Sequence, residues 1–207
     1  MDDAVVVTLI RHGLTEANMQ KRYIGWTDEP LSHEGKKALQ SLAFPSEPDL
    51  LFTSDLRRAA ETARIIYPNK PYAVLKELRE INFGEWEMKC YQELKEDDRY
   101  RNWLREFWRF PPPNGEAYEV FSKRVKKGWE KIIKHFSSKE VVHIAVITHG
   151  GVIRELLYRY SFSRKSYLEW QIKHGAFYCL TGKRSDVRRG KRCMWLSGEP
   201  STGKENG

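Results

Sequence analysis

Residues 5–13 read VVVTLIRHG, in which a run of apolar and β-branched side chains leads directly into Arg11 and His12. Such a short uncharged run is typical of a strand that is buried on both faces. A second run, VVHIAVIT at residues 141–148, leads in the same way into His149 and two glycines. Each predicted strand therefore presents a histidine at its carboxyl end, which is where ligands bind in open α/β sheets.

The rest of the chain alternates helical and strand-like patterns around these two runs. We expect helices over residues 32–42, 55–67, 116–135 and 150–160, and shorter strands over residues 49–53, 72–75, 177–180 and 193–196. In the long helix, apolar side chains recur at helical spacing at positions 120, 121, 125, 129, 132 and 133. This alternation predicts an α/β fold, a three-layer α/β/α sandwich with a mostly parallel central sheet.

One segment differs in character from the rest. Residues 76–115 are rich in charge and tryptophan, show only short helical patterns and end in PPPNG. Because a loop of this length without structure of its own is uncommon, we expect a small inserted helical cap. Its tryptophans form either an apolar wall for a substrate or the core of the cap. The prediction is one domain over residues 1–197 and a disordered tail over residues 198–207.

The composition is that of a soluble globular protein, with 40% hydrophobic and 31% charged residues among 207. No apolar run approaches the roughly 20 residues that span a membrane. The acidic N-terminus does not resemble a signal peptide, so we expect a cytoplasmic location without membrane contact. Three widely spaced cysteines, Cys90, Cys179 and Cys193, predict neither a disulfide framework nor a cysteine metal site.

The formal net charge of +8 favours anionic ligands. The clearest basic cluster is KRSDVRRGKR at residues 183–192, which is either a solvated face or a contact for nucleic acid. Because the other basic residues are spread along the chain, we favour the solvated face and expect no nucleic-acid partner.

The two strand-end histidines can serve as nucleophiles, acid–base groups, metal ligands or packing residues, and their neighbours favour a phosphate site. Arg11 precedes His12, and arginine suits phosphate because its planar guanidinium donates paired, charge-assisted hydrogen bonds. Glycines follow both histidines and leave room for a ligand beside the backbone. The sequence therefore predicts that a phosphoryl group binds at the carboxyl edge of the sheet.

Four sequence blocks resemble the histidine phosphatase superfamily, which includes cofactor-dependent phosphoglycerate mutases and related phosphomonoesterases. They are LIRHGLTEAN with YIGWTDEPLSHEG, TSDLRRAAETA, ELREINFGEWE and VITHGG, in the order typical of the family. Four ordered blocks are far more specific than the RHG tripeptide alone. The resemblance implies the phosphoglycerate mutase-like fold and phosphoryl transfer that needs neither a metal nor a cofactor.

The resemblance also implies a role for each residue that matches a family position. His12 would be the nucleophile that forms a phosphohistidine, with Arg11, Arg58 and His149 around the transferred phosphoryl group. The arginine directly before the alanine of the R-A-x-x-T pattern is Arg58, which leaves Arg57 as a surface or rim residue.

Glu80 would be the proton donor that protonates the leaving alkoxide and later activates water. Glu87 is the competing carboxylate, for which we favour a structural role. The further candidates for phosphate or substrate binding are Asn18, Thr15, Gly150 and Glu116. Turn or capping roles are at least as well supported for Thr15 and for Ser54. The histidines outside the motifs are expected at the surface or in the core: His33, His135, His143 and His174.

Mutases and phosphatases share this set of residues. The loop RYIGWTDEPLS resembles that of the mutases, whereas GEWE and FPPPNGEAYEVFSKRV resemble the broad-specificity and α-ribazole-phosphate phosphatases. Because the chain is also shorter than a typical mutase, we favour a phosphatase that acts on a small-molecule phosphomonoester, as a monomer or homodimer. The alternatives are a phosphoglycerate mutase and a binding protein without catalysis. Met88 and Glu61 depart from the usual glycine and glutamine, which affects the expected pocket shape but no catalytic group.

Overall fold

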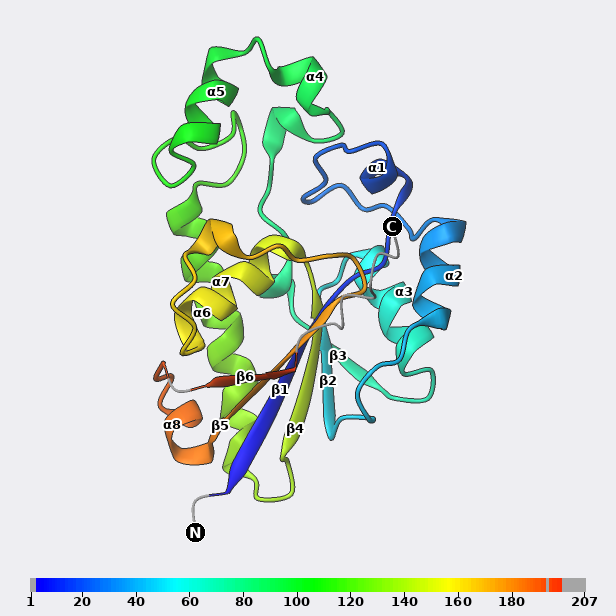
Figure 1. The fold of residues 1–207 in the computed structure, drawn as a ribbon, viewed down its shortest axis with the longest axis vertical. Helices are drawn as coiled ribbons and strands as arrows, with labels where there is room; N and C mark the ends of the chain where they lie inside the picture. Colours follow the sequence, from blue (N-terminus) through cyan, green and yellow to red (C-terminus); the bar gives the residue numbers. More distant parts are fainter. Residues whose placement is uncertain (1–2, 193, 199–207) are drawn as a thin grey trace, which may run out of the picture.

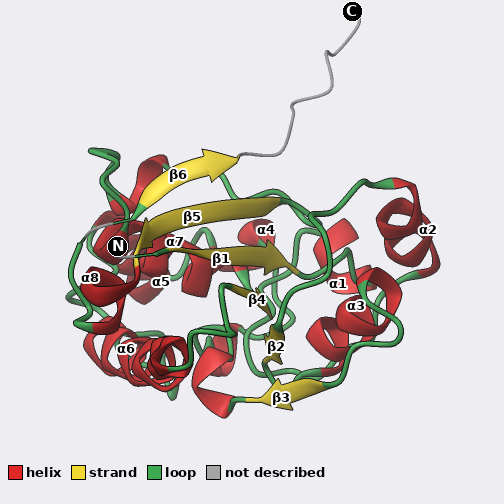
Figure 2. Cartoon of the chain, turned by 90° about the horizontal axis from the view of Figure 1, so that it is seen from below, coloured by secondary structure: helices red, strands yellow, loops and turns green. Residues whose placement is uncertain are grey.

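The computed structural model describes residues 3–192 and 194–198. Cys193 and residues 199–207 lie outside this range, so the expected tail is described only at Gly198, where the last strand ends. Six strands form one sheet in the order β3-β2-β4-β1-β5-β6 (Figure 2).

Most of this sheet is parallel. The parallel strands are β1 (Ala4–Arg11), β2 (Leu50–Thr53), β3 (Tyr72–Val74) and β4 (His143–Thr148). Strand β5 (Phe177–Lys183) runs antiparallel to β1, and β6 (Trp195–Gly198) runs antiparallel to β5. The mostly parallel sheet and the final strand pair are therefore confirmed.

Helices cover both faces of the sheet and complete the predicted three-layer sandwich (Figures 1 and 2). One face carries α6 (Tyr118–Ile133), α7 (Gly150–Tyr160) and α8 (Arg184–Arg188), and the other carries α2 (His33–Ser41) and α3 (Arg57–Ile66). The larger apolar core joins the sheet to α6 and α7, and a smaller one joins it to α3.

The apolar stripe of α6 follows the predicted spacing with one exception. Phe121, Val125, Trp129 and Ile132 are buried at intervals of three or four residues, which places them on one side of the helix. Val120 was expected on this stripe but is 57% exposed, because it lies one position away from the buried side.

The segment between β3 and α6 holds short helices, as the sequence indicates. They are η1 (Lys76–Leu78), η2 (Gly84–Trp86), α4 (Tyr91–Leu94) and α5 (Asp98–Arg105). Trp86, Leu94 and Tyr100 form a separate small cluster there, and the hydroxyl of Tyr23 lies 2.6 Å from that of Tyr100. Trp86 therefore serves the packing of this segment. Tyr23 follows α1 (Glu16–Met19), a short helix that the sequence did not predict.

Part of the basic cluster at 183–192 supports the fold. Arg184 is buried, and its Nη1 donates to the carbonyl oxygens of Phe136, Ser138 and Val141. Two nitrogens of Arg192 donate to the carbonyls of Ser161 and Ser163. Within the part of the chain that the structure describes, we find no helix with the length and apolar character that a bilayer crossing requires.

The parallel pairing of β1 with β4 positions the candidate site. Arg11 pairs with Thr148 in register, and the amide of His12 donates to the Thr148 carbonyl at 2.9 Å. The residues that follow these strands, His12 and His149, are therefore neighbours at one edge of the sheet.

Candidate active site

Three histidines meet at this edge, and the sequence predicted two of them there. The ring centroid of His12 lies 5.1 Å from that of His149 and 5.2 Å from that of His174. We expected His174 at the surface or in the core, away from the motif residues. This expectation is wrong, because the His174 ring contacts that of His12. Strand β5 runs antiparallel to β1, so the residues just before β5 reach the edge where β1 ends. The position of His174 ahead of a predicted strand was the only signal in the sequence.

His12 presents a neutral imidazole with one nitrogen available for attack. The residue is buried, and its Nδ1 lies 2.7 Å from the carbonyl oxygen of Gly13. Because a carbonyl oxygen can only accept, Nδ1 carries the proton and Nε2 carries the lone pair. Burial, together with the nearby charge of Arg58, holds the pKa of His12 well below its ordinary 6.5. The ring is therefore uncharged at neutral pH.

His149 is held by Ser54, the residue that follows β2. Its Nε2 lies 2.8 Å from Ser54 Oγ, and both side chains are fully buried. Burial and then the charges of Arg58 and Arg11 lower the pKa of His149 well below 6.5. If the Ser54 hydroxyl donates to Nε2, the single ring proton is on Nδ1 and can be donated to a ligand.

Two arginines flank the histidines, Arg58 fully buried and Arg11 partly buried. Arg58 donates from Nη1 to the Thr27 carbonyl at 2.8 Å and from Nη2 to the Gly25 carbonyl at 2.6 Å. Arg11 donates from Nη1 to the carbonyl of Ile172. Burial lowers the pKa of each guanidinium to about 10, so both remain charged at neutral pH. The side chain of Arg57, in contrast, is 59% exposed and lies at the surface.

Three buried nitrogens of this cluster have no hydrogen-bond partner among residues 3–192 and 194–198: Nε of Arg11, Nε of Arg58 and Nδ1 of His149. A buried donor without an acceptor costs about 1–3 kcal/mol. An anion with several oxygen atoms can accept hydrogen bonds from all three at once. The cluster therefore has the chemistry of a phosphoryl-binding site.

The carboxylate of Glu80 is oriented by two backbone amides. Oε1 accepts from the amide of Ile81 at 3.0 Å, and Oε2 accepts from the amide of Gly151 at 2.9 Å. A Cβ atom on residue 151 would lie only 2.2 Å from Oε1, so this close approach requires glycine. The sequence predicts that the glycines after His149 leave room for a ligand, and at Gly151 this room is taken by the Glu80 carboxylate.

The other predicted binding residues support the site in different ways. Thr15 and Asn18 form a capping box at α1, in which Thr15 Oγ1 accepts from the Asn18 amide and Asn18 Oδ1 accepts from the Thr15 amide. The capping box does not use the amide nitrogen of the Asn18 side chain. At Gly150 a Cβ would lie 3.3 Å from Cζ of Arg11, so the glycine makes room for this guanidinium.

The two remaining carboxylates hold neighbouring segments. Glu87 accepts from the amides of Gly25, Trp26, Thr27 and Phe83 and from the Thr27 hydroxyl. It therefore fixes the loop whose carbonyls hold Arg58. Glu116, a predicted substrate-binding residue, lies 2.7 Å from Arg124 in an ion pair.

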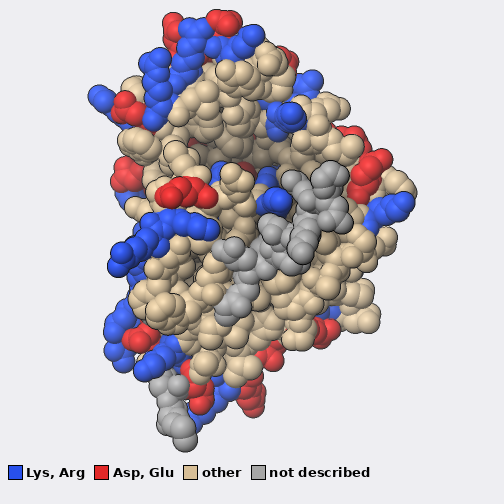
Figure 3. Space-filling view, in the orientation of Figure 1, with Lys and Arg blue, Asp and Glu red and all other residues tan. Residues whose placement is uncertain are grey.

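A cavity of about 290 Å³ adjoins Glu80. Its polar lining includes Glu80, the Gly151 backbone and Arg154, and the rest is mostly aromatic: Tyr23, Phe83, Trp103, Phe107, Tyr118 and Tyr167. Figure 3 shows that the face of the molecule below the α4–α5 end is hollowed, with basic side chains in the hollow. The cavity can therefore accept an apolar or aromatic group beside the carboxylate.

A sequence profile of the histidine phosphatase superfamily (branch 1) matches residues 7–188. The chain belongs to this superfamily. It is 35% identical over 159 residues to the adenosylcobalamin/alpha-ribazole phosphatase of Escherichia coli, covering 73% of this chain and 76% of the relative. It is also 32% identical over 172 residues to a phosphoglycerate mutase of Schizosaccharomyces pombe, covering 73% and 77%.

A crystal structure of a putative alpha-ribazole-5'-P phosphatase from Escherichia coli is similar in fold, with a TM-score of 0.79 and 25% identity over 94% of this chain and 96% of that one. The phosphoglycerate mutase-like fold and the enzyme family predicted from the sequence are therefore confirmed.

Two departures from the family pattern have local explanations. Met88 adopts a left-handed backbone conformation with a φ of 63°, which explains why a glycine is usual at this position. Glu61 lies 3.2 Å from Lys36 and 3.7 Å from Arg57 in ion pairs and accepts from the Leu31 amide. A glutamine at position 61 could accept the amide hydrogen bond but could not form the ion pairs.

Proposed function

We propose that the chain hydrolyses phosphomonoesters through a phosphohistidine on Nε2 of His12. The observation that carries this proposal is the set of buried, unpartnered nitrogens of Arg11, Arg58 and His149 around the neutral ring of His12. These groups can bind a phosphoryl group and stabilise the negative charge on its equatorial oxygens.

The reaction divides into two displacements. Nε2 of His12 attacks phosphorus, the bond from phosphorus to the ester oxygen breaks, and Glu80 donates its proton to the departing oxygen. The ionised Glu80 then takes a proton from water as the water oxygen attacks phosphorus. The bond from nitrogen to phosphorus breaks, and inorganic phosphate leaves. Asn18 supplies a neutral donor to the phosphoryl oxygens.

The aromatic cavity beside Glu80 supports an ester whose alcohol carries an apolar or aromatic group. Relatives of this chain are named as alpha-ribazole phosphatases, which supports testing the phosphomonoester of α-ribazole first. We therefore propose α-ribazole 5'-phosphate as the first specific substrate to test.

A panel of phosphomonoesters tests these proposals. We expect phosphate release from α-ribazole 5'-phosphate and aryl phosphates in the presence of a chelator, and loss of activity in His12→Ala. Isomerisation of phosphoglycerate with added 2,3-bisphosphoglycerate, without phosphate release, would instead identify a mutase. Near-normal hydrolysis by His12→Ala would refute the phosphohistidine.

A further inference from the structure

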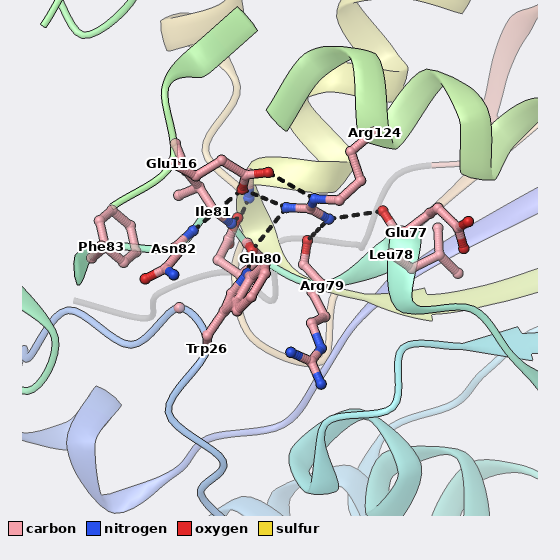
Figure 4. A network of polar contacts seen from close by, with 12 residues as sticks. Trp26, Glu77, Leu78, Arg79, Glu80, Ile81, Asn82, Phe83, Glu116 and Arg124 are labelled. Atoms are coloured by element: carbon pink, nitrogen blue, oxygen red, sulfur yellow. Dashed lines mark hydrogen bonds and ion pairs between the residues drawn. The ribbon is translucent and has the colours of Figure 1, made fainter. Parts of the chain in front are cut away.

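We infer that Arg124 of α6 is a positioning residue for Glu80, and that its guanidinium fixes the backbone from which this proton donor projects. The inference rests on the proposed role of Glu80. Figure 4 shows Arg124 among the backbone of residues 77–80, Glu116 and Trp26.

Arg124 gathers the backbone carbonyls of the segment that leads to Glu80. Its Nη1 donates to the carbonyls of Glu77 and Arg79, both at 2.9 Å, and its Nη2 donates to the carbonyl of Glu80 at 3.1 Å. The intervening carbonyl of Leu78 accepts from the Thr148 hydroxyl at 2.7 Å. All four carbonyls of residues 77–80 are therefore fixed, and one of them is tied to the strand that carries His149.

Glu116 completes the hydrogen bonding of this guanidinium. It accepts from Nε of Arg124 at 2.8 Å and from Nη2 at 2.7 Å, and it is itself only 9% exposed. An arginine has five N–H donors, and these two bonds together with the three carbonyls use all of them. A largely buried cation also needs a buried counterion, which Glu116 supplies. A lysine has three donors and cannot reproduce this arrangement.

Trp26 holds the same peptide from another segment of the chain. Its Nε1 donates to the Glu80 carbonyl at 2.9 Å, and the guanidinium of Arg79 lies 4.9 Å from the centre of its ring. The loop of Trp26 is the one whose carbonyls hold Arg58. The backbone of the proton donor and the phosphate-binding arginine are therefore fixed by one connected set of contacts.

The position of the Glu80 backbone matters because, among residues 3–192 and 194–198, the hydrogen bonds to its carboxylate come from two backbone amides. One amide belongs to the adjacent Ile81 and moves with the segment, and the other belongs to Gly151 on α7. A displacement of the segment therefore moves the carboxylate away from the departing oxygen. A misplacement of about 1 Å can lower a rate by about 10²-fold.

The dependence of the rate on the leaving group tests this role. Phosphoryl transfer from 4-nitrophenyl phosphate needs little protonation, because nitrophenolate leaves readily, whereas transfer from a primary alkyl phosphate needs the acid. We expect Arg124→Lys to lower kcat/KM for the alkyl ester at least about tenfold more than for the nitrophenyl ester, within the range of about 10²–10⁴ for general acid catalysis. Glu80→Gln provides the reference for this signature.

Trp26→Phe tests the same role in a milder way, because it removes one donor to the Glu80 carbonyl from a residue that is 39% exposed. We expect the same selective loss, smaller in size. The matched control is Lys131→Gln on α6. Lys131 forms an ion pair with the side chain of Glu77 at 2.5 Å, and this ion pair involves none of the four carbonyls of residues 77–80. We expect the control to leave unchanged the ratio of kcat/KM for the alkyl ester to kcat/KM for the nitrophenyl ester.

The outcomes separate this inference from the proposed function. Suppose that Glu80→Gln shows the selective loss of kcat/KM for the alkyl ester. If Arg124→Lys and Trp26→Phe then lower kcat/KM for both esters equally, or leave both values unchanged, the positioning role is wrong. If Glu80→Gln shows no selective loss, the proton-donor assignment fails and the positioning role fails with it. Comparable urea midpoints for Trp26→Phe and the wild type would show that the readout is not a folding defect.

Discussion

Replacing Gly151 with alanine tests whether the position of the Glu80 carboxylate sets the rate of the first displacement. The added Cβ would lie 2.2 Å from Oε1, 3.1 Å from Cδ and 3.4 Å from Oε2 of Glu80. Because the first distance is about 1 Å below van der Waals contact, the carboxylate has to move by about that amount. We expect kcat/KM for an alkyl phosphate to fall by about 10²-fold, which corresponds to about 2.7 kcal/mol.

The same substitution is not expected to destabilise the helix. Gly151 is the second residue of α7, and alanine is favoured over glycine within a helix by about 1 kcal/mol. The assay is therefore a pair of measurements: kcat/KM for alkyl and nitrophenyl phosphates, and the free energy of unfolding in urea.

The adjacent Gly150→Ala provides a matched comparison, because its Cβ would approach Arg11 at 3.3 Å rather than Glu80. We expect Gly150→Ala to raise KM for both substrates without changing the ratio of their kcat/KM values. An unchanged alkyl phosphate rate in a folded Gly151→Ala enzyme would refute the placement of Glu80 at the reacting oxygen.

Three further predictions concern the support of the site and the stability of the fold. Glu87→Gln should raise KM for all phosphomonoesters, because it weakens the hydrogen bonds that hold the loop around Arg58. A loss of kcat/KM that is confined to alkyl phosphates would instead identify Glu87 as the general acid. Met88→Gly should raise the free energy of unfolding by up to about 1 kcal/mol, because a left-handed non-glycine residue costs about 1–2 kcal/mol; a lower urea midpoint would contradict this. The pKa values of the three site histidines are lowered on folding, mainly by burial, so the unfolded chain binds more protons below pH 6.5. The free energy of unfolding should therefore fall as the pH drops from 6 to 5, by about 1.4 kcal/mol per pH unit for each histidine. His174→Gln should reduce this dependence of the free energy of unfolding on pH, measured by urea titrations at several pH values.

The order of strands and helices could be predicted from the sequence because the signals are local. The apolar runs before His12 and His149 are continuous in sequence, and a parallel sheet brings their carboxyl ends to one edge. The four sequence blocks also implied catalytic roles for the residues that lie in them. For Glu87, the structural role favoured from the sequence agrees with its hydrogen bonds to the loop of Gly25.

Only the tertiary structure decided the contacts that join distant segments. His174 reaches His12 because an antiparallel strand begins at that edge, and Arg124 reaches the carbonyl of Glu80 across 44 residues of sequence. Glu116 was predicted at the substrate, but its partner is Arg124, and this pairing depends on how α6 crosses the segment of residues 77–80. Hydrophobic periodicity indicates which side of a helix or strand is buried. Hydrogen bonds between segments that are distant in sequence depend on how the fold places these segments, and no local sequence pattern predicts this placement.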